Sequence, residues 1–233
     1  MKQIGGLLLV IIFVLASLPA WAGSITGTVN FSGTAPEKEK FIVAKDSETC
    51  GSGIREMEWV RAVDGKLSQV VVYLDKIEGS KPWPAESAIS RIDQKDCTFT
   101  PHMQVIRNGA EIEVLNSDPV QHNIHTYEVI GRAMRTVFNV NQPHKGSFKQ
   151  VINLRRGKWL KLGCDAHDFM HAWVFVASNP YYAVTGDDGA FNITDVPAGE
   201  YKLVAYHPTM GKQHINISVG NSAAEAEFVF PKM

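Results

Sequence analysis

The chain has 233 residues, nearly equal numbers of basic and acidic side chains (23 and 24) and a formal net charge of −1. With 45% hydrophobic residues it can bury a sizeable core, as one large domain or two small ones. Its lysines and arginines are scattered rather than gathered into a stripe, so nucleic acid is not an expected partner.

The first 22 residues have the organisation of a secretory signal peptide. Lys2 gives the positive start, an uncharged apolar run extends from Ile4 to Leu18, and Ala20-Trp21-Ala22 has the small-x-small pattern of a cleavage site. The apolar run is shorter than the roughly 20 residues of a membrane-spanning helix. We therefore expect an exported protein, periplasmic or extracellular, with Gly23 as its mature N-terminus and no membrane span after cleavage. An uncleaved N-terminal anchor is the alternative.

The remaining sequence consists largely of short alternating or β-branched runs separated by turn residues, and no long stretch has a clear helical period. We therefore predict an all-β sandwich or barrel. In chain order the predicted strands cover residues 25–31, 70–74, 111–115, 159–162, 172–177, 190–193, 201–206, 213–219 and 225–230.

The segment from Ala183 to Pro208 contains a Thr-x-x-Asp-Gly-x-Phe hairpin motif between turn residues. It closely resembles the carboxypeptidase regulatory-like domain, a small transthyretin-like β-sandwich without catalytic residues of its own. That family opens with a Gly-x-Val strand, matched by Gly27-Thr28-Val29, and continues with a strand such as Val70 to Leu74. The stretch before the hairpin is far longer than an ordinary loop.

The resemblance therefore implies an interleaved organisation. Residues 1–22 are the signal peptide, residues 23–96 and 178–233 form the regulatory-like sandwich, and residues 97–177 are a second unit inserted into it. Two domains fused in sequence are the simpler alternative.

All three cysteines lie in the exported part of the chain. In an oxidising compartment two of them are expected to pair and one is left over. Cys50 and Cys97 have unremarkable neighbours, whereas Cys164 lies among histidines. We therefore predict a Cys50–Cys97 disulfide and a metal-bound thiolate at Cys164.

Two segments carry the side chains of a mononuclear copper site, which needs two imidazoles, one thiolate and a weak axial ligand. The strand at 111–115 runs into a turn that is followed by His122-Asn123, and the strand at 159–162 leads into Cys164-x-x-His167-x-x-Met170. This combination resembles the plastocyanin-like cupredoxins. The resemblance implies a Greek-key cupredoxin-like barrel or sandwich, packed with the regulatory-like one, that holds one copper ion through His122, Cys164, His167 and Met170.

Several alternatives stay open at this point. Plastocyanins place the axial methionine two residues later, where this chain has Ala172, and His171 could replace Met170 in a red-copper variety of the site. His125 lies three residues after His122, so in an extended segment the two side chains face opposite ways. We therefore expect His125 at the rim of the site. Zinc also suits a Cys-His-His set. A hydrolase built on Cys164, His167 and Asp165 is disfavoured, since a nucleophile and its base normally come from separate segments.

The favoured function is that of an exported one-electron carrier, not an enzyme. Its expected partners are a cytochrome or a periplasmic or membrane-bound oxidoreductase. A copper-binding or copper-delivery protein without a redox role is the second hypothesis, and a non-enzymatic β-sandwich interaction module is the third.

Overall fold

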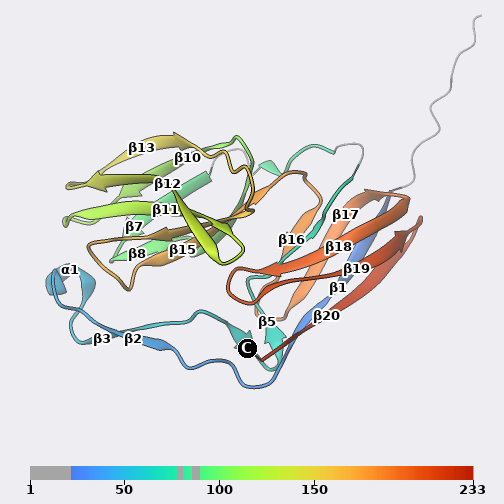
Figure 1. Cartoon of the computed structure of the whole chain (residues 1–233), viewed down its shortest axis with the longest axis horizontal. Helices are drawn as coiled ribbons and strands as arrows, with labels where there is room; N and C mark the ends of the chain where they lie inside the picture. The colour runs from blue at the N-terminus through green and yellow to red at the C-terminus, as the bar shows by residue number, and fades with distance from the viewer. Residues whose placement is uncertain (1–21, 78–80, 86–89, 233) are drawn as a thin grey trace, which may run out of the picture.

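The computed structural model describes residues 22–77, 81–85 and 90–232, and this part of the chain is almost entirely β-structure (Figure 1). The predicted signal peptide lies outside the described residues except for Ala22, with which the first strand begins. The strands in chain order are β1 (Ala22–Ser32), β2 (Glu39–Ile42), β3 (Ile54–Met57), β4 (Ala62–Val63), β5 (Lys66–Leu67), β6 (Val71–Leu74), β7 (Ser90–Lys95), β8 (Thr98–Thr100), β9 (Met103–Arg107), β10 (Glu111–Asn116), β11 (His122–Ile130), β12 (Ala133–Gln142), β13 (Gly146–Val151), β14 (Trp159–Gly163), β15 (His171–Ala177), β16 (Tyr182–Val184), β17 (Ala190–Pro197), β18 (Gly199–His207), β19 (Gly211–Val219) and β20 (Ala223–Pro231).

Four main sheets form two sandwiches that lie side by side. One sandwich has the sheet β17-β1-β5-β4, with β20 beside β1, packed on the sheet β16-β6-β18-β19. The other has the sheet β13-β10-β7-β8 packed on the sheet β12-β11-β14-β15-β9. The all-β prediction is confirmed, and each of the nine predicted strands overlaps an observed one.

Strands that are buried on both faces show where the two sandwiches contact each other. In β15 every side chain is buried: Ala172 and Val174 belong to the core of the second sandwich, whereas Trp173 and Phe175 belong to a third apolar cluster. Strand β6 behaves likewise, since Val71 and Tyr73 join that same cluster whereas Val72 and Leu74 belong to the core of the first sandwich. A continuous apolar run is what a strand with two covered faces requires. The third cluster is therefore the contact between the two sandwiches.

The strands before β7 and after β15 pair with one another in the first sandwich, as β1 does with β17 and β20. Strands β7 to β15 build the second sandwich. β7 begins at Ser90, ahead of the predicted boundary at residue 97, and pairs with β10. The domain limits themselves, and the relationship of the first sandwich to the regulatory-like family, stay predictions.

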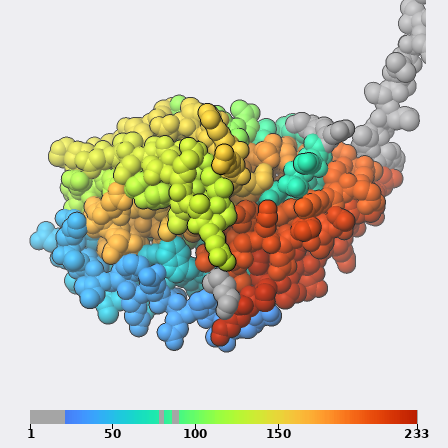
Figure 2. Space-filling model, in the orientation of Figure 1, coloured from blue at the N-terminus to red at the C-terminus, as the bar shows by residue number. Residues whose placement is uncertain are grey.

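A long connection between β1 and β4, which we call the arm (residues 33–61), leaves the first sandwich and crosses the second. Figure 1 shows it running past both sandwiches, and Figure 2 shows it packed against the lower edge of the second one. It contains the two-stranded sheet β2-β3 and a single helical turn, α1 (Ser47–Cys50). The Cys50–Cys97 disulfide, with a Cα–Cα distance of 5.1 Å, ties α1 to the turn between β7 and β8. The predicted pairing of these cysteines is confirmed.

Candidate metal centre

One predicted ligand comes from a strand, and the other three come from the loop that follows the neighbouring strand. His122 is the first residue of β11, and Cys164 directly follows β14. The two strands are antiparallel, with His125 opposite Gly163. His122, three residues ahead of His125, therefore lies beside the loop that begins at Cys164 and carries His167 and Met170 into β15.

Three of these residues point their donor atoms at one another in the interior. The Nδ1 atoms of His122 and His167 are 3.1 Å apart, and Sγ of Cys164 lies 3.9 Å from the first and 3.8 Å from the second. The exposed fractions of the three residues are 0, 2 and 5% for His122, His167 and Cys164. Two nitrogens and one thiolate around a single ion in a trigonal plane would be roughly 3.4–3.7 Å apart. The donors present therefore fit a copper ion of the two-imidazole, one-thiolate kind.

Cys164 is the free cysteine of the chain, and its surroundings favour the thiolate that metal binding needs. Burial alone would raise the pKa of this thiol, but hydrogen bonds with the rings of His122 and His167 outweigh burial and lower it to about 6. The amide oxygen of Asn123 lies 3.5 Å from Sγ and also accepts the backbone N–H of Asp165 at 2.7 Å. Asn123 thus fixes the start of the ligand loop against β11.

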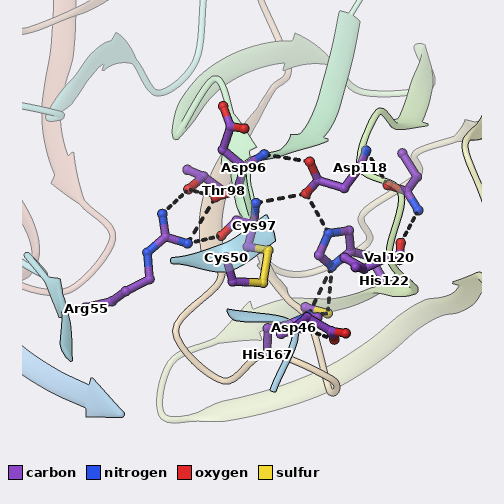
Figure 3. Close-up of a disulfide and its surroundings, with 12 residues drawn as sticks. Asp46, Cys50, Arg55, Asp96, Cys97, Thr98, Asp118, Val120, His122 and His167 are labelled. Carbon is purple, nitrogen blue, oxygen red and sulfur yellow. Dashed lines mark hydrogen bonds and ion pairs between the residues drawn. A yellow bond between two sulfur atoms is a disulfide. The ribbon is translucent and has the colours of Figure 1, made fainter. Parts of the chain in front are cut away.

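A buried carboxylate orients the first histidine (Figure 3). Nε2 of His122 donates to Asp118 at 2.8 Å, and the same carboxylate accepts the backbone N–H groups of Asp96 and Cys97 at 2.8 Å each. Burial opposes the charged ring, yet hydrogen bonds with Cys164 and Asp118 raise the pKa of His122. A proton held on Nε2 leaves the Nδ1 lone pair facing Cys164, which is the arrangement of a metal-bound imidazole.

A second carboxylate, supplied by the arm, orients the other histidine. Nε2 of His167 donates to Asp46 at 3.0 Å, so Nδ1 of this ring also faces Cys164. Asp46 immediately precedes α1, whose last residue forms the disulfide, and the disulfide sulfurs themselves lie within 4.8 Å of a ring nitrogen of His167 (Figure 3). Neither Asp46 nor Asp118 is among the site residues predicted from the sequence. The position of Asp118 four residues before His122 could have indicated its contact with that ring. No local sequence pattern indicates the contact of Asp46 with His167.

The ligand loop itself is a pair of tight turns. The backbone N–H of His167 donates to Cys164 at 3.3 Å, and that of Met170 donates to His167 at 2.9 Å. Met170 is 2% exposed and shares an apolar cluster with Cys164 and Phe169. Its role as axial ligand stays a prediction.

The rings of His125 and His171, the two other histidines considered as ligands, contact other partners. Nδ1 of His125 faces Asp165 at 3.1 Å, and its ring stacks on Tyr127 with the centroids 4.1 Å apart. Nε2 of His171 faces Nε2 of His102 at 2.9 Å. The three-residue groups with metal-binding geometry in the described part of the chain include neither of them.

No family model matches the chain, and no curated protein matches it. Several solved structures do resemble part of it. A copper-containing nitrite reductase (NirK) from Thermus scotoductus SA-01 is 16% identical with a TM-score of 0.32, over 51% of this chain and 25% of its own. A reduced Cu(I) form of an amicyanin mutant is 14% identical with a TM-score of 0.32, over 44% of this chain and 87% of its own.

A purple cupredoxin from Nitrosopumilus maritimus is 20% identical with a TM-score of 0.32, over 38% of this chain and 99% of its own. The match thus spans only a quarter of the length of the nitrite reductase but nearly all of the purple cupredoxin. These identities and TM-scores are low, so the chemistry assigned to the centre depends on its own donor atoms.

Proposed function

We propose that this chain is an exported cupredoxin-like protein that holds one copper ion and carries single electrons. The observation that carries the proposal is the buried triangle of His122, Cys164 and His167, whose donor atoms are separated by 3.1–3.9 Å. Met170 is the proposed axial ligand. Bound copper would supply a change between Cu(I) and Cu(II), and a thiolate with two imidazoles suits both states.

The surrounding residues fit this task because they hold the donors still. Asp118 and Asp46 each fix one ring, Asn123 fixes the start of the loop, and the loop's own backbone bonds fix its shape. Burial of all three donors keeps water away from the metal position. A centre that binds both oxidation states in one geometry has little to rearrange when an electron arrives or leaves.

The disulfide and the N-terminal sequence both support the proposed export of the chain. Disulfides persist mainly in proteins outside the cytoplasm, and this chain has one between Cys50 and Cys97. Across residues 22–77, 81–85 and 90–232, no helix combines the length and apolar character needed to cross a bilayer. The proposed partner is a redox protein of the same compartment, such as a cytochrome or an oxidoreductase of the periplasm or membrane.

The test is to add Cu(II) to the purified mature chain and to record its visible spectrum and midpoint potential. We expect an intense thiolate-to-copper band, near 600 nm or nearer 400 nm for the red-copper form, and a reversible one-electron couple. Cys164→Ser should abolish that band while the far-UV circular dichroism stays unchanged. Tight Cu(I) binding without a reversible couple would instead support copper delivery. Absence of copper binding at Cys164, or a preference for zinc, would overturn the proposal.

A further inference from the structure

A second pair of histidines faces a hollow outside the Cys164 centre. His102 follows β8, and His171 opens β15; their Nε2 atoms are 2.9 Å apart and their rings are nearly perpendicular, at 84°. The two rings line a hollow of about 440 Å³ whose wall includes Glu56 and Glu58 of the arm. His102 is half-buried and His171 is 8% exposed, so both side chains are enclosed by the protein on most sides.

The ring of His171 is held in place by its neighbours. Trp59 packs against it with the ring centroids 4.4 Å apart. Its Nε2 atom faces Nε2 of His102, and a neutral imidazole nitrogen is a common metal ligand.

The two Nε2 atoms are close enough to share one ion. Two nitrogens at about 2.0–2.1 Å from an ion are roughly 2.9 Å apart in neighbouring positions of a square, and the observed distance is 2.9 Å. Two imidazoles completed by carboxylate or water oxygens are a ligand set that suits Cu(II) in this geometry. Glu58 lines the same hollow, where its carboxylate pairs with Arg61 at 3.4 Å.

We propose that His102 and His171 form a second copper site, of the tetragonal Cu(II) type, separate from the Cys164 centre. Its other positions would be filled by water or by a carboxylate of the arm, so its ligands exchange with solvent. Met170 directly precedes His171 in the chain and lines the same hollow. One peptide unit therefore joins a proposed ligand of each copper.

The experiment uses the mature chain with Cys164→Ser and His122→Gln together, which leaves the first centre with one imidazole and no thiolate, and Cu(II) alone as the probe. We expect one bound Cu(II) with a tetragonal electron paramagnetic resonance spectrum, no intense visible band, and two imidazole nitrogens in the electron spin-echo envelope modulation. In the same background His102→Gln should weaken Cu(II) binding at least tenfold by calorimetry. His214→Gln, at an exposed histidine on β19, is the matched control and should leave binding unchanged.

The pair is an ordinary histidine–histidine hydrogen bond if the double variant Cys164→Ser, His122→Gln binds no Cu(II), or binds it equally well after His102→Gln. A modulation spectrum with a single imidazole would also overturn the second site, and that measurement does not depend on the folding of His102→Gln. The failure of the first centre is recognised separately, because it appears in the wild-type chain as the absence of the thiolate band.

Discussion

The carboxylate of Asp46 accepts a hydrogen bond from Nε2 of His167 at 3.0 Å, although the two residues are 121 positions apart in the chain. His167 belongs to the ligand loop of the second sandwich, whereas Asp46 belongs to the arm that departs from the first. The side chain of His167 is only 1% exposed beneath this contact. The arm thus covers one edge of the proposed copper centre and sets the tautomer of one of its ligands.

Replacing Asp46 by Ala should weaken copper binding without removing the ligands themselves. Loss of an outer carboxylate at a metal-bound histidine typically costs about 10–100-fold in metal affinity. Loss of its negative charge should also raise the midpoint potential, because the oxidised ion carries the greater positive charge. Competition with a copper chelator measures the affinity, and voltammetry measures the potential.

Asp168→Ala is the matched control for Asp46→Ala, because Asp168 is an exposed carboxylate on the same ligand loop. We expect the affinity of this variant to stay within about twofold of the wild-type chain. If Asp46→Ala behaved no differently from Asp168→Ala, the Asp46–His167 bond would have no role in holding the metal.

The disulfide should stabilise both the fold and the centre. Converting Cys50 and Cys97 together to Ser removes a cross-link that closes a loop with a sequence separation of 47, worth about 4 kcal/mol on the chain-entropy model. It also frees α1, which follows Asp46, and loosens the turn whose Cys97 N–H binds Asp118. We expect a lower denaturant midpoint and weaker copper binding. Unchanged copper affinity in the double variant would show that the arm stays in place without its cross-link.

Met170→Leu tests the axial ligand. Leu fills nearly the same volume in the buried cluster, so the free energy of unfolding should fall by less than about 1.5 kcal/mol. Loss of a weak axial sulfur should keep the thiolate band and raise the midpoint potential. Loss of copper from this variant would point to a different axial arrangement.

The predictable part of the fold is the part in which local pattern and burial agree. Strands β6 and β15 are continuous apolar runs because both of their faces are covered, and alternation identifies β10 and β17. Strand β11 escaped detection since it carries buried polar residues such as His122, Thr126 and Glu128, whose hydrogen bonds replace apolar contacts. The arm has no repeated pattern at all, and its position depends on the disulfide and on packing against a distant sheet.

The same distinction applies to the metal centre. Cys164, His167 and Met170 share one short loop, so their spacing in the sequence carries a signal, and the free cysteine adds a chemical one. Asp46 reaches His167 only through the path of the arm, which no local pattern encodes. The His102–His171 pair likewise depends on the pairing of β9 with β15, two strands that are far apart in the chain.

Glu128 should make the stability of the second sandwich depend on acid pH. Its side chain is fully buried, pairs with Arg135 and accepts the backbone N–H groups of Arg155, Arg156 and Gly157. Burial would raise the pKa of this carboxyl, but these hydrogen bonds outweigh burial and lower it to about 2, well below the roughly 4.3 of an ordinary glutamate.

The folded state therefore favours the ionised carboxylate of Glu128. Its stabilisation is fully present above about pH 4.3 and is lost as the pH falls toward 2. Glu128→Gln should lower the free energy of unfolding at pH 7 by on the order of 3 kcal/mol, because it removes a buried, hydrogen-bonded charge. It should also flatten the dependence of stability on pH between about 4.5 and 2. Urea titrations at several pH values measure both effects.

The control is Glu111→Gln. Glu111 forms an exposed ion pair with Lys149, so this variant should change the free energy of unfolding by less than about 0.5 kcal/mol. An unaltered acid dependence in Glu128→Gln would mean that other carboxylates determine it.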